Sequence, residues 1–410
     1  MSTLTATAEA LRLVNGSESS SDSPVPEVSV VMPCLNEADT LGTCIVKAQR
    51  AFRESGIVGE IIVADNGSTD ESSKIALELG ARVVLVEAKG YGNALMGGIA
   101  AARGKFLIMG DADDSYDFLE IPKIVARLRE GHDIVQGCRL PAGGGTVMPG
   151  AMPFSHRWLG NPLFSLMVRH MFWSPIHDVY CGLRGFTRQF YESLDQRCTG
   201  MEFATEMMVK AGVYRARIAE VPITLHQDGR KSHPPHLNTF RDGWRTLRFL
   251  LLYSPRWLFW YQGWALIGLG VFGYLLAMPQ VTIGGVTFDV HTLLVASLAL
   301  LLGFQAVVFA VFTKAFAVGE RLLPADPRLE RFFKVVTLEK GLIAGGAGLC
   351  MGIGLLLAAV NQWRLSGFGP LDYAYTMRWV IPGVTLTALA LQTVLSSFFV
   401  SILSLRGSMK

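Results

Sequence analysis

The sequence predicts an α/β domain with a doubly wound, mostly parallel sheet, followed by an all-α membrane domain of four helices. Short apolar segments alternate with helix-like segments over residues 28–137 of the 410-residue chain. The last third then contains four long apolar segments. The chain is 50% hydrophobic and its mean hydropathy is +0.34, which is more apolar than expected for a purely soluble protein.

The start of the chain has neither the basic residues nor the apolar stretch of a signal peptide. Residues 1–27 are therefore expected to form a disordered tail. The six cysteines show no CxxC spacing, which favours a reduced compartment over a disulfide framework or a zinc site. A net charge of +3 without a basic run gives no indication of nucleic-acid binding. We therefore expect no nucleic-acid partner.

The first strand is expected at Val28–Met32, broken at Pro33 because proline lacks the N–H of a sheet ladder. A helix is expected over residues 38–55, where apolar side chains recur at helical spacing. The second strand, Glu60–Ala64, leads into the turn Asp65–Asp70. In this turn Asn and Gly permit a tight bend, and Asp or Ser caps the next helix.

After that helix, a third strand is expected at Arg82–Glu87 and a helix of small residues at Gly92–Arg103. The central strand, residues 105–109, is apolar, lies between two glycines and runs directly into acidic residues. A helix at Glu120–Arg129 and a strand at Asp133–Gly137 continue the alternation. Strands that alternate with helices of about 10–15 residues predict a parallel sheet.

Beyond the sheet, the pattern predicts an apolar helix at 158–173, a helix at 200–211 and a returning strand at 213–225. Residues 238–254 are amphipathic, with arginines at helical spacing against apolar side chains. This composition is typical of an interfacial helix on anionic lipid, and also of a surface helix packed on the domain. We therefore divide the chain into a tail, an α/β domain, an interfacial helix and a membrane domain, with bounds 1–27, 28–237, 238–256 and 257–405.

The four apolar segments are each close to the roughly 20 residues that a membrane-spanning helix needs. They are Trp257–Met278, Thr292–Phe312, Leu342–Val360 and Val380–Leu403. Helices buried in a soluble core would be shorter and carry more charge. The loop 314–340 holds six Lys and Arg, whereas residues 279–291 hold none. The positive-inside rule therefore predicts a multi-pass protein of the inner or plasma membrane, with the α/β domain and both termini in the cytoplasm.

Acidic residues follow the central strand directly. Asp111 and Asp113 share one turn, and such a pair of carboxylates is a hard-oxygen site for Mg²⁺ or Mn²⁺. In open α/β sheets, ligands bind outside the carboxyl ends of the strands. A solvated acidic turn is the plain alternative. Two other strands also end in polar residues, at Pro33–Glu37 and Asp65–Asp70.

In this order, separated by helical units, the three strand ends resemble family 2 glycosyltransferases of the GT-A fold, over roughly residues 28–256. Together with the four apolar segments, the chain resembles the polyprenyl-phosphate glycosyltransferases, which include dolichol-phosphate mannose and glucose synthases. This resemblance implies a nucleotide-sugar donor, a polyprenyl-phosphate acceptor in a membrane, and Mg²⁺ or Mn²⁺. It also allows a membrane homo-oligomer.

On the donor side, the resemblance implies that eight residues bind the nucleotide sugar. They are Pro33, Asn36, Glu37, Asp65, Lys89, Asp111, Ala112 and Asp113. Asp111 and Asp113 match the metal-binding Asp-x-Asp of the family. Relatives often have a glutamine as a further metal ligand at the position of Ser115. Either Ser115, Asp114 or water would fill that position here.

On the acceptor side, the resemblance implies six residues near the lipid phosphate. They are Arg139, Arg157, Asp178, Arg184, Arg230 and Lys231. A guanidinium group suits this role because its planar fork binds phosphate oxygens bidentately. Surface salt bridges are the alternative for the first two arginines and for Arg184. His226, His233 and His236 are not expected to bind metal, because Pro234–Pro235 separates two of them.

A phosphate acceptor is already anionic, so it needs no general base. Held by Arg139 and Arg157, it would attack the anomeric carbon in line while the metal-bound diphosphate leaves, which inverts the linkage. A transferase acting on a glycolipid hydroxyl would need a base such as Asp178, Glu202 or Glu206. A processive polysaccharide synthase is disfavoured because the chain lacks its Gln-x-x-Arg-Trp motif. A membrane scaffold is the non-enzymatic alternative.

Overall fold

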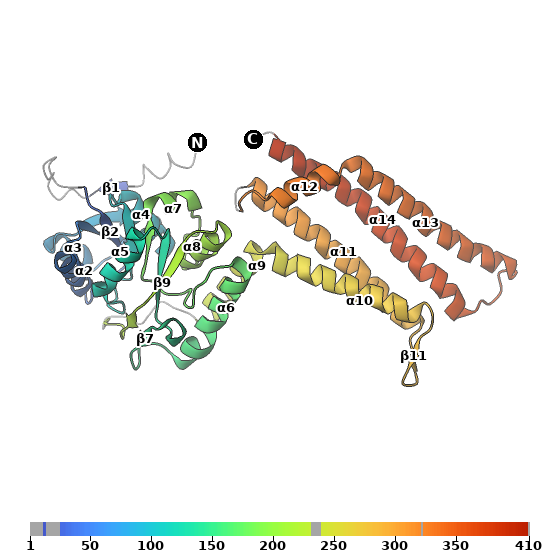
Figure 1. The fold of residues 1–410 in the computed structure, drawn as a ribbon, viewed down its shortest axis with the longest axis horizontal. Coiled ribbons are helices and arrows are strands. Elements are labelled where there is room, and N and C mark those ends of the chain that lie inside the picture. The colour runs from blue at the N-terminus through green and yellow to red at the C-terminus, as the bar shows by residue number, and fades with distance from the viewer. Residues whose placement is uncertain (1–10, 14–24, 231–238, 321–322, 409–410) are drawn as a thin grey trace. The chain divides into compact units, whose positions relative to one another are not determined.

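The computed structural model describes residues 11–13, 25–230, 239–320 and 323–408, and the chain divides into two compact units, Met1–Leu250 and Leu251–Lys410 (Figure 1). The first unit is the α/β domain and the second contains the apolar helices. The predicted fold class, an α/β domain followed by four apolar helices, is confirmed.

The α/β domain is built on one mixed sheet of eight strands, in the order β1-β4-β3-β2-β5-β8-β6-β9. Its strands are β1 (Leu11–Leu13), β2 (Val28–Cys34), β3 (Gly59–Asp65), β4 (Arg82–Val86), β5 (Phe106–Met109), β6 (Ile134–Cys138), β8 (Arg184–Thr187) and β9 (Ile218–Pro222). The strands β4, β3, β2 and β5 run parallel, as the sequence predicted. Because β3, β2 and β5 are neighbours, the three polar strand ends meet at one edge of the sheet.

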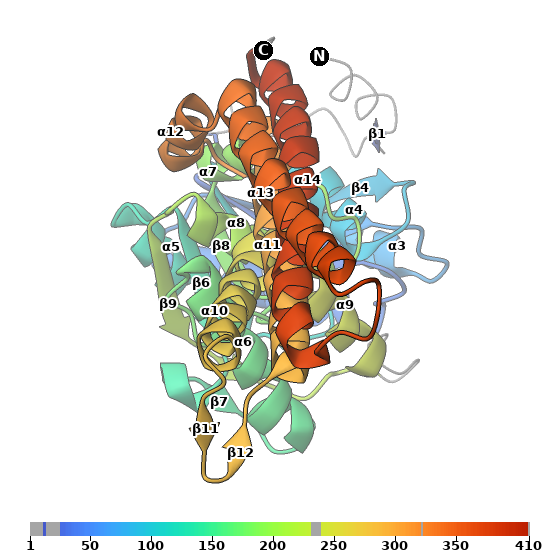
Figure 2. The same cartoon turned by 90° about the vertical axis from the view of Figure 1, so that its right-hand side faces the viewer.

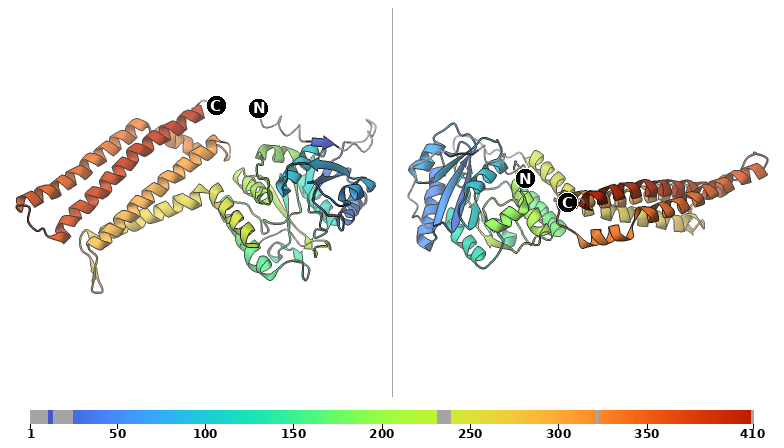
Figure 3. Two further views of the ribbon diagram at one scale, coloured as in Figure 1. Left: turned by 180° about the vertical axis from the view of Figure 1, so that it is seen from behind. Right: turned by 90° about the horizontal axis from the view of Figure 1, so that it is seen from above.

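Helices cover both faces of this sheet (Figure 3). The helices α2 (Leu41–Ser55), α3 (Ser72–Glu78) and α5 (Ile121–Arg129) lie on one face, and α4 (Tyr91–Ala101) and α8 (Glu202–Val213) lie on the other. The helix α7 (Arg188–Leu194) packs on α8. The domain also contains α6 (Asn161–Phe172), α9 (Thr239–Tyr253), a π-helical turn at His156–Gly160, and a small parallel sheet of β7 (Thr146–Val147) and β10 (Thr224–Leu225).

The alternation of side chains along β2 explains why its sequence is mostly apolar. Val28, Val30 and Met32 belong to the core that the sheet forms with α2 and α5. Val31 points to the opposite face, where a Cβ at Gly98 of α4 would approach it to 2.5 Å. Both faces of a doubly wound sheet are buried, so most positions of its central strands are apolar.

The expected break at Pro33 is wrong, because β2 continues through Pro33 to Cys34. Gly110 N–H donates to the carbonyl oxygen of Val31, so odd-numbered positions of β2 face β5. Pairing between β2 and β5 ends at Val31 and Met109. The missing N–H of Pro33 therefore faces a side where no ladder bond is due, and the proline is tolerated.

Within the eight-stranded sheet, two strands were not expected from the sequence, and neither was the helix that follows one of them. β8 lies between β5 and β6 and runs antiparallel to both, which makes the sheet mixed. β1 pairs antiparallel with β4, so the tail expected to be disordered contributes a short edge strand. The helix α7 follows β8, and the side chain of Thr187 caps it by accepting from the N–H of Phe190.

The second unit contains four helices that are long and apolar enough to cross a membrane: Arg256–Ala277, Val290–Gly319, Leu338–Leu365 and Tyr373–Leu403 (Figure 2). They correspond to a π-helical turn with α10 (Tyr261–Ala277), α11 (Val290–Gly319), α13 (Leu338–Leu365) and α14 (Tyr373–Ser408). A hairpin of β11 (Thr282–Ile283) and β12 (Val286–Thr287) connects α10 to α11. The amphipathic α12 (Pro327–Val335) lies in the loop that the sequence marked as basic.

Glycine pairs bring these helices close together. A Cβ at Gly263 of α10 would lie 2.9 Å from the carbonyl oxygen of Gly303 of α11, and a Cβ at Gly352 of α13 would lie 3.0 Å from that of Gly383 of α14. Small residues at such contacts let helix backbones approach closely, which is a common mode of packing in membranes. The four segments predicted from the sequence are confirmed as helices.

Candidate functional site

The loops after β2 and β3 hold each other in place. Asn36 is in the left-handed region with a φ of 59°, its N–H donates to Ser68 Oγ, and its Oδ1 accepts from Thr69 N–H at 2.8 Å. Asp65 is buried, its Oδ1 accepts from Gly67 and Ser68 N–H, and its Oδ2 accepts from Ser73 Oγ. The two loops are therefore rigid, and the donor-side residues expected there share one edge of the sheet.

Lys89 and Ala112 lie beside these loops. Lys89 Nζ donates to the carbonyl oxygen of Asn66 at 2.6 Å, and Asn66 Oδ1 accepts from Gly90 N–H. The carbonyl oxygen of Ala112 accepts from Thr40 Oγ1 at 2.7 Å. Hydrogen bonds thus link the loops that follow the parallel strands β2, β3, β4 and β5. These loops carry the residues that were predicted to bind the donor.

Asp111 is partly buried at the end of β5 and bonded to a tyrosine. Tyr91, at the start of α4, donates its hydroxyl to Asp111 Oδ1 at 2.8 Å. Burial and the negative charge of Asp113 raise the pKa of Asp111 to about 6, against the hydrogen bond from Tyr91 and the charges of Arg230 and Arg139. Asp111 therefore lies in a partly buried position beside a second carboxylate.

Asp113 is held by one loop neighbour and one distant arginine. Its Oδ1 accepts from the N–H and the Oγ of Ser115, at 3.0 and 2.6 Å. Its Oδ2 lies 3.1 Å from Arg230 Nη2, and Arg230 Nε donates to Glu37 Oε2 at 2.8 Å. Burial by itself would lower the pKa of the Arg230 guanidinium. The interactions with Asp113 and Glu37 outweigh the effect of burial, so the pKa is raised. Arg230 thus neutralises the carboxylates of the expected donor site.

The donor set fits a divalent cation that is completed by substrate oxygens. Among the described residues, no three histidine, cysteine or acidic side chains gather around one point. The pair Asp111 and Asp113 is nevertheless close enough for the charge of one to raise the pKa of the other. Mg²⁺ is often bound by one or two carboxylates together with substrate phosphates. Asp114 is directed elsewhere, because its Oδ1 pairs with Lys47 Nζ of α2 at 2.8 Å.

Arg139 and Asp178 form a buried ion pair. Arg139 donates Nε to Asp178 Oδ2 at 2.7 Å and Nη2 to Oδ1 at 2.8 Å, and its Nη1 donates to the Tyr116 hydroxyl at 3.3 Å. The charge of Asp178 outweighs desolvation and holds the pKa of Arg139 well above its usual value. The guanidinium group of Arg139 was expected to bind a phosphate, but it binds the carboxylate of Asp178 here. Asp178 therefore acts as the ion-pair partner of Arg139.

Arg184 does not present its guanidinium to a ligand. It lies on β8 and is completely buried, and it donates to the carbonyl oxygens of Ala204, Val179 and Cys181. Burial lowers the pKa of Arg184. The phosphate-binding role expected for it conflicts with this placement, which supports a structural role joining β8, α8 and the loop at 178–183.

Arg157, which was also expected on the acceptor side, contacts a tryptophan ring. Arg157 is on the π-helical turn, and its guanidinium carbon lies 5.3 Å from the centre of the Trp158 ring. Its Nε is buried with no hydrogen-bond partner among the described residues. Lys231, His233 and His236 lie outside the described residues. The expected pairing of Arg139 with Arg157 around one phosphate stays a prediction.

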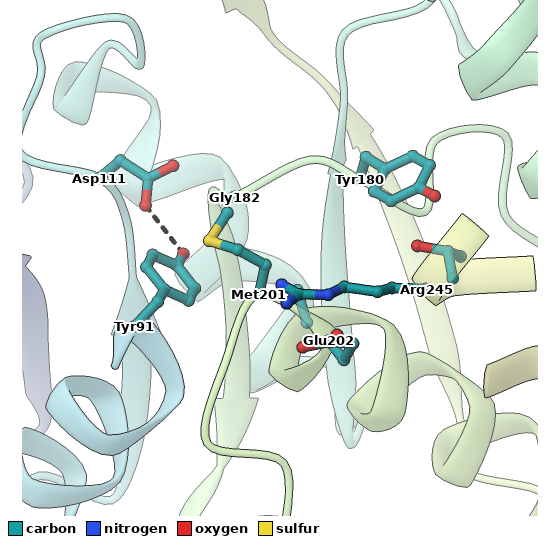
Figure 4. A pocket seen from close by; sticks show the side chains of 9 residues that line it. Tyr91, Asp111, Tyr180, Gly182, Met201, Glu202 and Arg245 are labelled. Atoms are coloured by element: carbon teal, nitrogen blue, oxygen red, sulfur yellow. Dashed lines mark hydrogen bonds between the residues drawn. The ribbon is translucent and has the colours of Figure 1, made fainter. Parts of the chain in front are cut away.

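A cavity of about 100 Å³ lies directly beside Asp111 (Figure 4). It is lined by Tyr91, Asp111, Tyr180, Gly182, Met201, Glu202, Ala204, Arg245 and Thr246. A Cβ at Gly182 would come within 2.5 Å of Asp111 Oδ2, so only glycine leaves the carboxylate in this position. The acidic strand end therefore borders a cavity and is not simply a solvated turn.

Sequence reasoning named Glu202 as a candidate base only for a glycolipid-hydroxyl acceptor, placed Arg245 on an amphipathic helix, and did not single out Tyr91 or Tyr180. Glu202 begins α8, and Arg245 lies in the middle of α9. Neither position can be joined to Asp111 without knowing how α8 and α9 pack on the sheet. The one signal available was that Tyr91 follows Lys89–Gly90, a segment already assigned to the donor side.

The chain thus joins an α/β domain that has paired aspartates at the end of a central strand to four helices that are long and apolar enough to cross a membrane. Two family models match. Residues 29–195 match "Glycosyl transferase family 2", and residues 311–404 match "Glycosyltransferase family 2 C-terminal transmembrane region". The chain belongs to glycosyltransferase family 2, and it is a membrane protein.

Curated relatives match this chain over different lengths. The low-salt glycan biosynthesis hexosyltransferase Agl6 of Haloferax volcanii is 37% identical over 92% of this chain and 90% of its own length. A dolichyl-phosphate hexose transferase of the same organism is 29% identical over 49% of this chain and 83% of its own. An undecaprenyl-phosphate 4-deoxy-4-formamido-L-arabinose transferase of Klebsiella pneumoniae is 29% identical over 49% of this chain and 60% of its own.

A solved structure is also similar. It is glucosyl-3-phosphoglycerate synthase from Mycobacterium tuberculosis in complex with Mn²⁺ and UDP-glucose. The identity is 23% and the TM-score is 0.44, over 55% of this chain and 78% of that chain.

Proposed function

We propose that this glycosyltransferase moves a hexose from a UDP- or GDP-sugar to a polyprenyl phosphate, with inversion at the anomeric carbon. The observation that carries the proposal is the pair Asp111 and Asp113 after β5, with Asp111 lining a cavity, in a chain that continues into helices long and apolar enough to cross a membrane. The names of two relatives, which act on dolichyl and undecaprenyl phosphates, support the lipid-phosphate acceptor. The basic loop at 314–340 supports a cytoplasmic catalytic domain.

Asp111 and Asp113 would hold a Mg²⁺ or Mn²⁺ ion, and Ser115 fixes the orientation of Asp113. The ion would supply charge neutralisation at the diphosphate of the donor. The linked loops that carry Asn36, Glu37 and Asp65 would bind the nucleoside part, with Lys89 beside the phosphates. The cavity beside Asp111 would take the transferred sugar and the attacking phosphate.

The chain's own residues then act mainly by position and charge. Tyr91 fixes the carboxylate of Asp111 through its hydroxyl, and the buried Arg139 adds positive charge behind it. A phosphate oxygen is anionic at neutral pH, so no side chain has to remove a proton before the oxygen attacks the anomeric carbon. Holding the two reactants in line contributes much of the acceleration in such reactions.

Arg230→Gln is expected to increase the affinity of the nucleotide-free protein for Mn²⁺ about tenfold or more, because it removes a positive charge 3.1 Å from Asp113. Isothermal titration with MnCl₂ measures this change. Arg82→Gln, which removes an arginine paired with Glu60 elsewhere in the domain, is the matched control and should leave the affinity unchanged. A weaker or equal affinity in Arg230→Gln would place the Mn²⁺ ion away from Asp113.

The proposal is tested with the purified full chain in lipid vesicles, Mn²⁺ or Mg²⁺, undecaprenyl or dolichyl phosphate, and a panel of labelled UDP- and GDP-hexoses. The expected result is a labelled, organic-soluble product that depends on the metal and on one donor. Label that remains in the aqueous phase for every donor, with both acceptors and both metals, would contradict the proposal.

A transferase acting on a glycolipid hydroxyl is the second candidate, because the carboxylate of Glu202 lines the cavity beside Asp111 and could act as a general base. Glu202→Gln separates the two. A phosphate acceptor needs no base, so we expect this variant to keep its turnover number within about threefold. A loss of about a hundredfold or more, the size typical of a missing general base, would favour the hydroxyl acceptor.

A further inference from the structure

We propose that Glu206 of α8 is a positioning residue that acts on Asp111 through Tyr91. Glu206 holds the loop between α7 and α8, residues 195–201, against the start of α4, where Tyr91 donates to Asp111. This inference rests on the proposed function, because Asp111 belongs to the proposed metal and donor site. In the sequence, Glu206 was a candidate base for a hydroxyl acceptor. In the structure it is completely buried and is not among the residues that line the cavity.

Glu206 forms a buried ion pair with Lys210, one helical turn later on α8. Lys210 Nζ lies 2.7 Å from Glu206 Oε1, and the two side chains are 3% and 0% exposed. Lys210 also donates to the carbonyl oxygen of Asp195, at the beginning of the loop, at 2.7 Å. Charged groups are rarely buried unless they are paired and hydrogen-bonded. The ion pair is therefore fixed in position and can anchor the loop.

The loop is bound to Glu206 through its backbone. Glu206 Oε2 accepts from the N–H of Cys198 at 2.8 Å and from the N–H of Arg197 at 3.1 Å. Backbone N–H groups outside helices and strands need other partners, and hydrogen bonds to a carboxylate are among the stronger ones. A buried carboxylate that accepts from two successive N–H groups therefore fixes the path of the loop.

The carbonyl groups of the same loop contact the first turn of α4. The carbonyl oxygen of Thr199 accepts from the N–H of Asn93 at 3.2 Å. This N–H belongs to the first turn of the helix, where backbone donors have no partner within the helix. The loop therefore caps α4 from outside, and its position influences the position of the start of α4.

Tyr91 lies between two glycines that pack directly on this loop. A Cβ at Gly90 or at Gly92 would lie 2.4 Å from a carbonyl oxygen of the loop, which is too close for any side chain. Glycine at both positions therefore lets the loop lie on α4 on either side of Tyr91. The hydroxyl of Tyr91 in turn donates to Asp111 Oδ1 at 2.8 Å. These contacts join Glu206 to Asp111.

A displaced loop would affect the site by moving Tyr91 away from Asp111. A hydrogen bond to a charged group contributes about 1.5–3 kcal/mol, so its loss would free the carboxylate to rotate. Met201 and Glu202, where the loop meets α8, also line the cavity beside Asp111 (Figure 4). A shift of about 1 Å in a group that positions the reactants can lower a rate by about a hundredfold. Glu206 can therefore influence transfer without contacting a substrate.

Two variants disturb the loop from opposite sides. Glu206→Gln removes the charge and one of the accepting oxygens, and Gly92→Ala places a methyl group against the loop while leaving the ion pair intact. We expect each variant to lower kcat at least about tenfold. In a Tyr91→Phe background, each should lower kcat less than about twofold further, because the hydroxyl through which they act is absent. Full losses in that background would overturn the inference, and Gly92→Ala decides it if Glu206→Gln does not fold.

Two matched controls separate positioning from a general loss of stability. Ser174→Ala removes another buried hydrogen bond to α8, from Ser174 Oγ to the carbonyl oxygen of Met208 at 3.1 Å. Gly97→Ala adds a methyl group to α4 against the side chain of Val86. Both controls should lower the melting temperature but keep kcat within about twofold of wild type. A loss of kcat in the controls as large as in Glu206→Gln would overturn the inference.

Hydrogen exchange of the full chain in lipid vesicles tests the same link without measuring transfer. Glu206→Gln should raise the exchange rate at least about tenfold in both the loop and residues 91–94, because the N–H of Asn93 donates to the loop. Ser174→Ala should leave both segments unchanged. Faster exchange in the loop alone would overturn the inference.

Failure of the inference and failure of the proposed function give different results. If the wild type transfers sugar to polyprenyl phosphate but the effects of Glu206→Gln and Tyr91→Phe on kcat multiply, the inference alone is wrong. If the wild type transfers sugar to no polyprenyl phosphate, the proposed function is wrong. Hydrogen exchange then still decides whether Glu206 holds the start of α4.

Discussion

Asp113→Asn is expected to lower glycosyl transfer at least about a hundredfold while the protein stays folded. Asn keeps the size of the side chain and can still accept from the N–H and the hydroxyl of Ser115, so the loop conformation should persist. What it loses is the negative charge that would bind the divalent cation and that now pairs with Arg230. Initial rates of transfer at saturating Mn²⁺, together with circular dichroism, measure both parts of this expectation.

Asp114→Asn is the matched control for that variant. It removes the same charge one position along the same turn, but Asp114 pairs with Lys47 of α2. Its φ of 58° is in the left-handed region, which asparagine tolerates. Transfer by Asp114→Asn should remain within about threefold of wild type. If both variants lost transfer activity to the same extent, the activity would depend on the total negative charge of the loop. That result would contradict a cation held by Asp113.

Asp178→Asn is expected to destabilise the α/β domain by about 3–5 kcal/mol, which corresponds to a melting temperature lower by roughly 6–20 °C. The physical reason is that both Asp178 oxygens accept from Arg139, and neither residue is exposed enough for water to replace the lost partner. Asparagine would leave the guanidinium charge buried without a counter-charge. Thermal unfolding of the detergent-solubilised full chain, followed by tryptophan fluorescence, measures the difference.

Two further variants show whether the cost comes from the uncompensated charge. Asp195→Asn removes the acid of an exposed pair with Arg197, and exposed pairs contribute about 1 kcal/mol or less. The double replacement Arg139→Met with Asp178→Leu should recover most of the stability, because two apolar side chains leave no charge unpaired. A double variant as unstable as Asp178→Asn would contradict this account.

The parallel half of the sheet could be predicted because each of its strands is specified by a short segment of the sequence. The segments around β2, β3, β4 and β5 are mostly apolar, and each is followed by a helix with its own apolar face. Strand β8 could not be predicted in the same way. It has only four residues, Arg-Gly-Phe-Thr, and its place between β5 and β6 is set by pairing over long distances in the chain.

The same distinction holds for the candidate site. Asp111, Asp113 and the loops that carry Asn36 and Asp65 come from adjacent strands, so chain order was enough to bring them together. The roles of arginines depend instead on which partner reaches them. The sequence alone does not show that Arg184 is buried. In the structure its guanidinium donates to backbone carbonyl oxygens.

Arg245 shows the converse case. In the sequence it is one of several arginines on an amphipathic helix, and nothing local separates it from Arg248. Only the packing of α9 beside α8 and the end of β5 gives Arg245 a position on the cavity wall. Side chains on helix surfaces therefore remain the least predictable part of such a site.

The most direct test of the central claim is anomalous diffraction at the manganese edge from crystals of the full chain grown with Mn²⁺ and the nucleoside diphosphate that the transfer assay identifies. The account predicts one strong peak within coordination distance of Asp113, on the side of the cavity that Asp111 lines. A fully occupied nucleotide with no anomalous peak near either aspartate, or with a peak held by other residues, would contradict it.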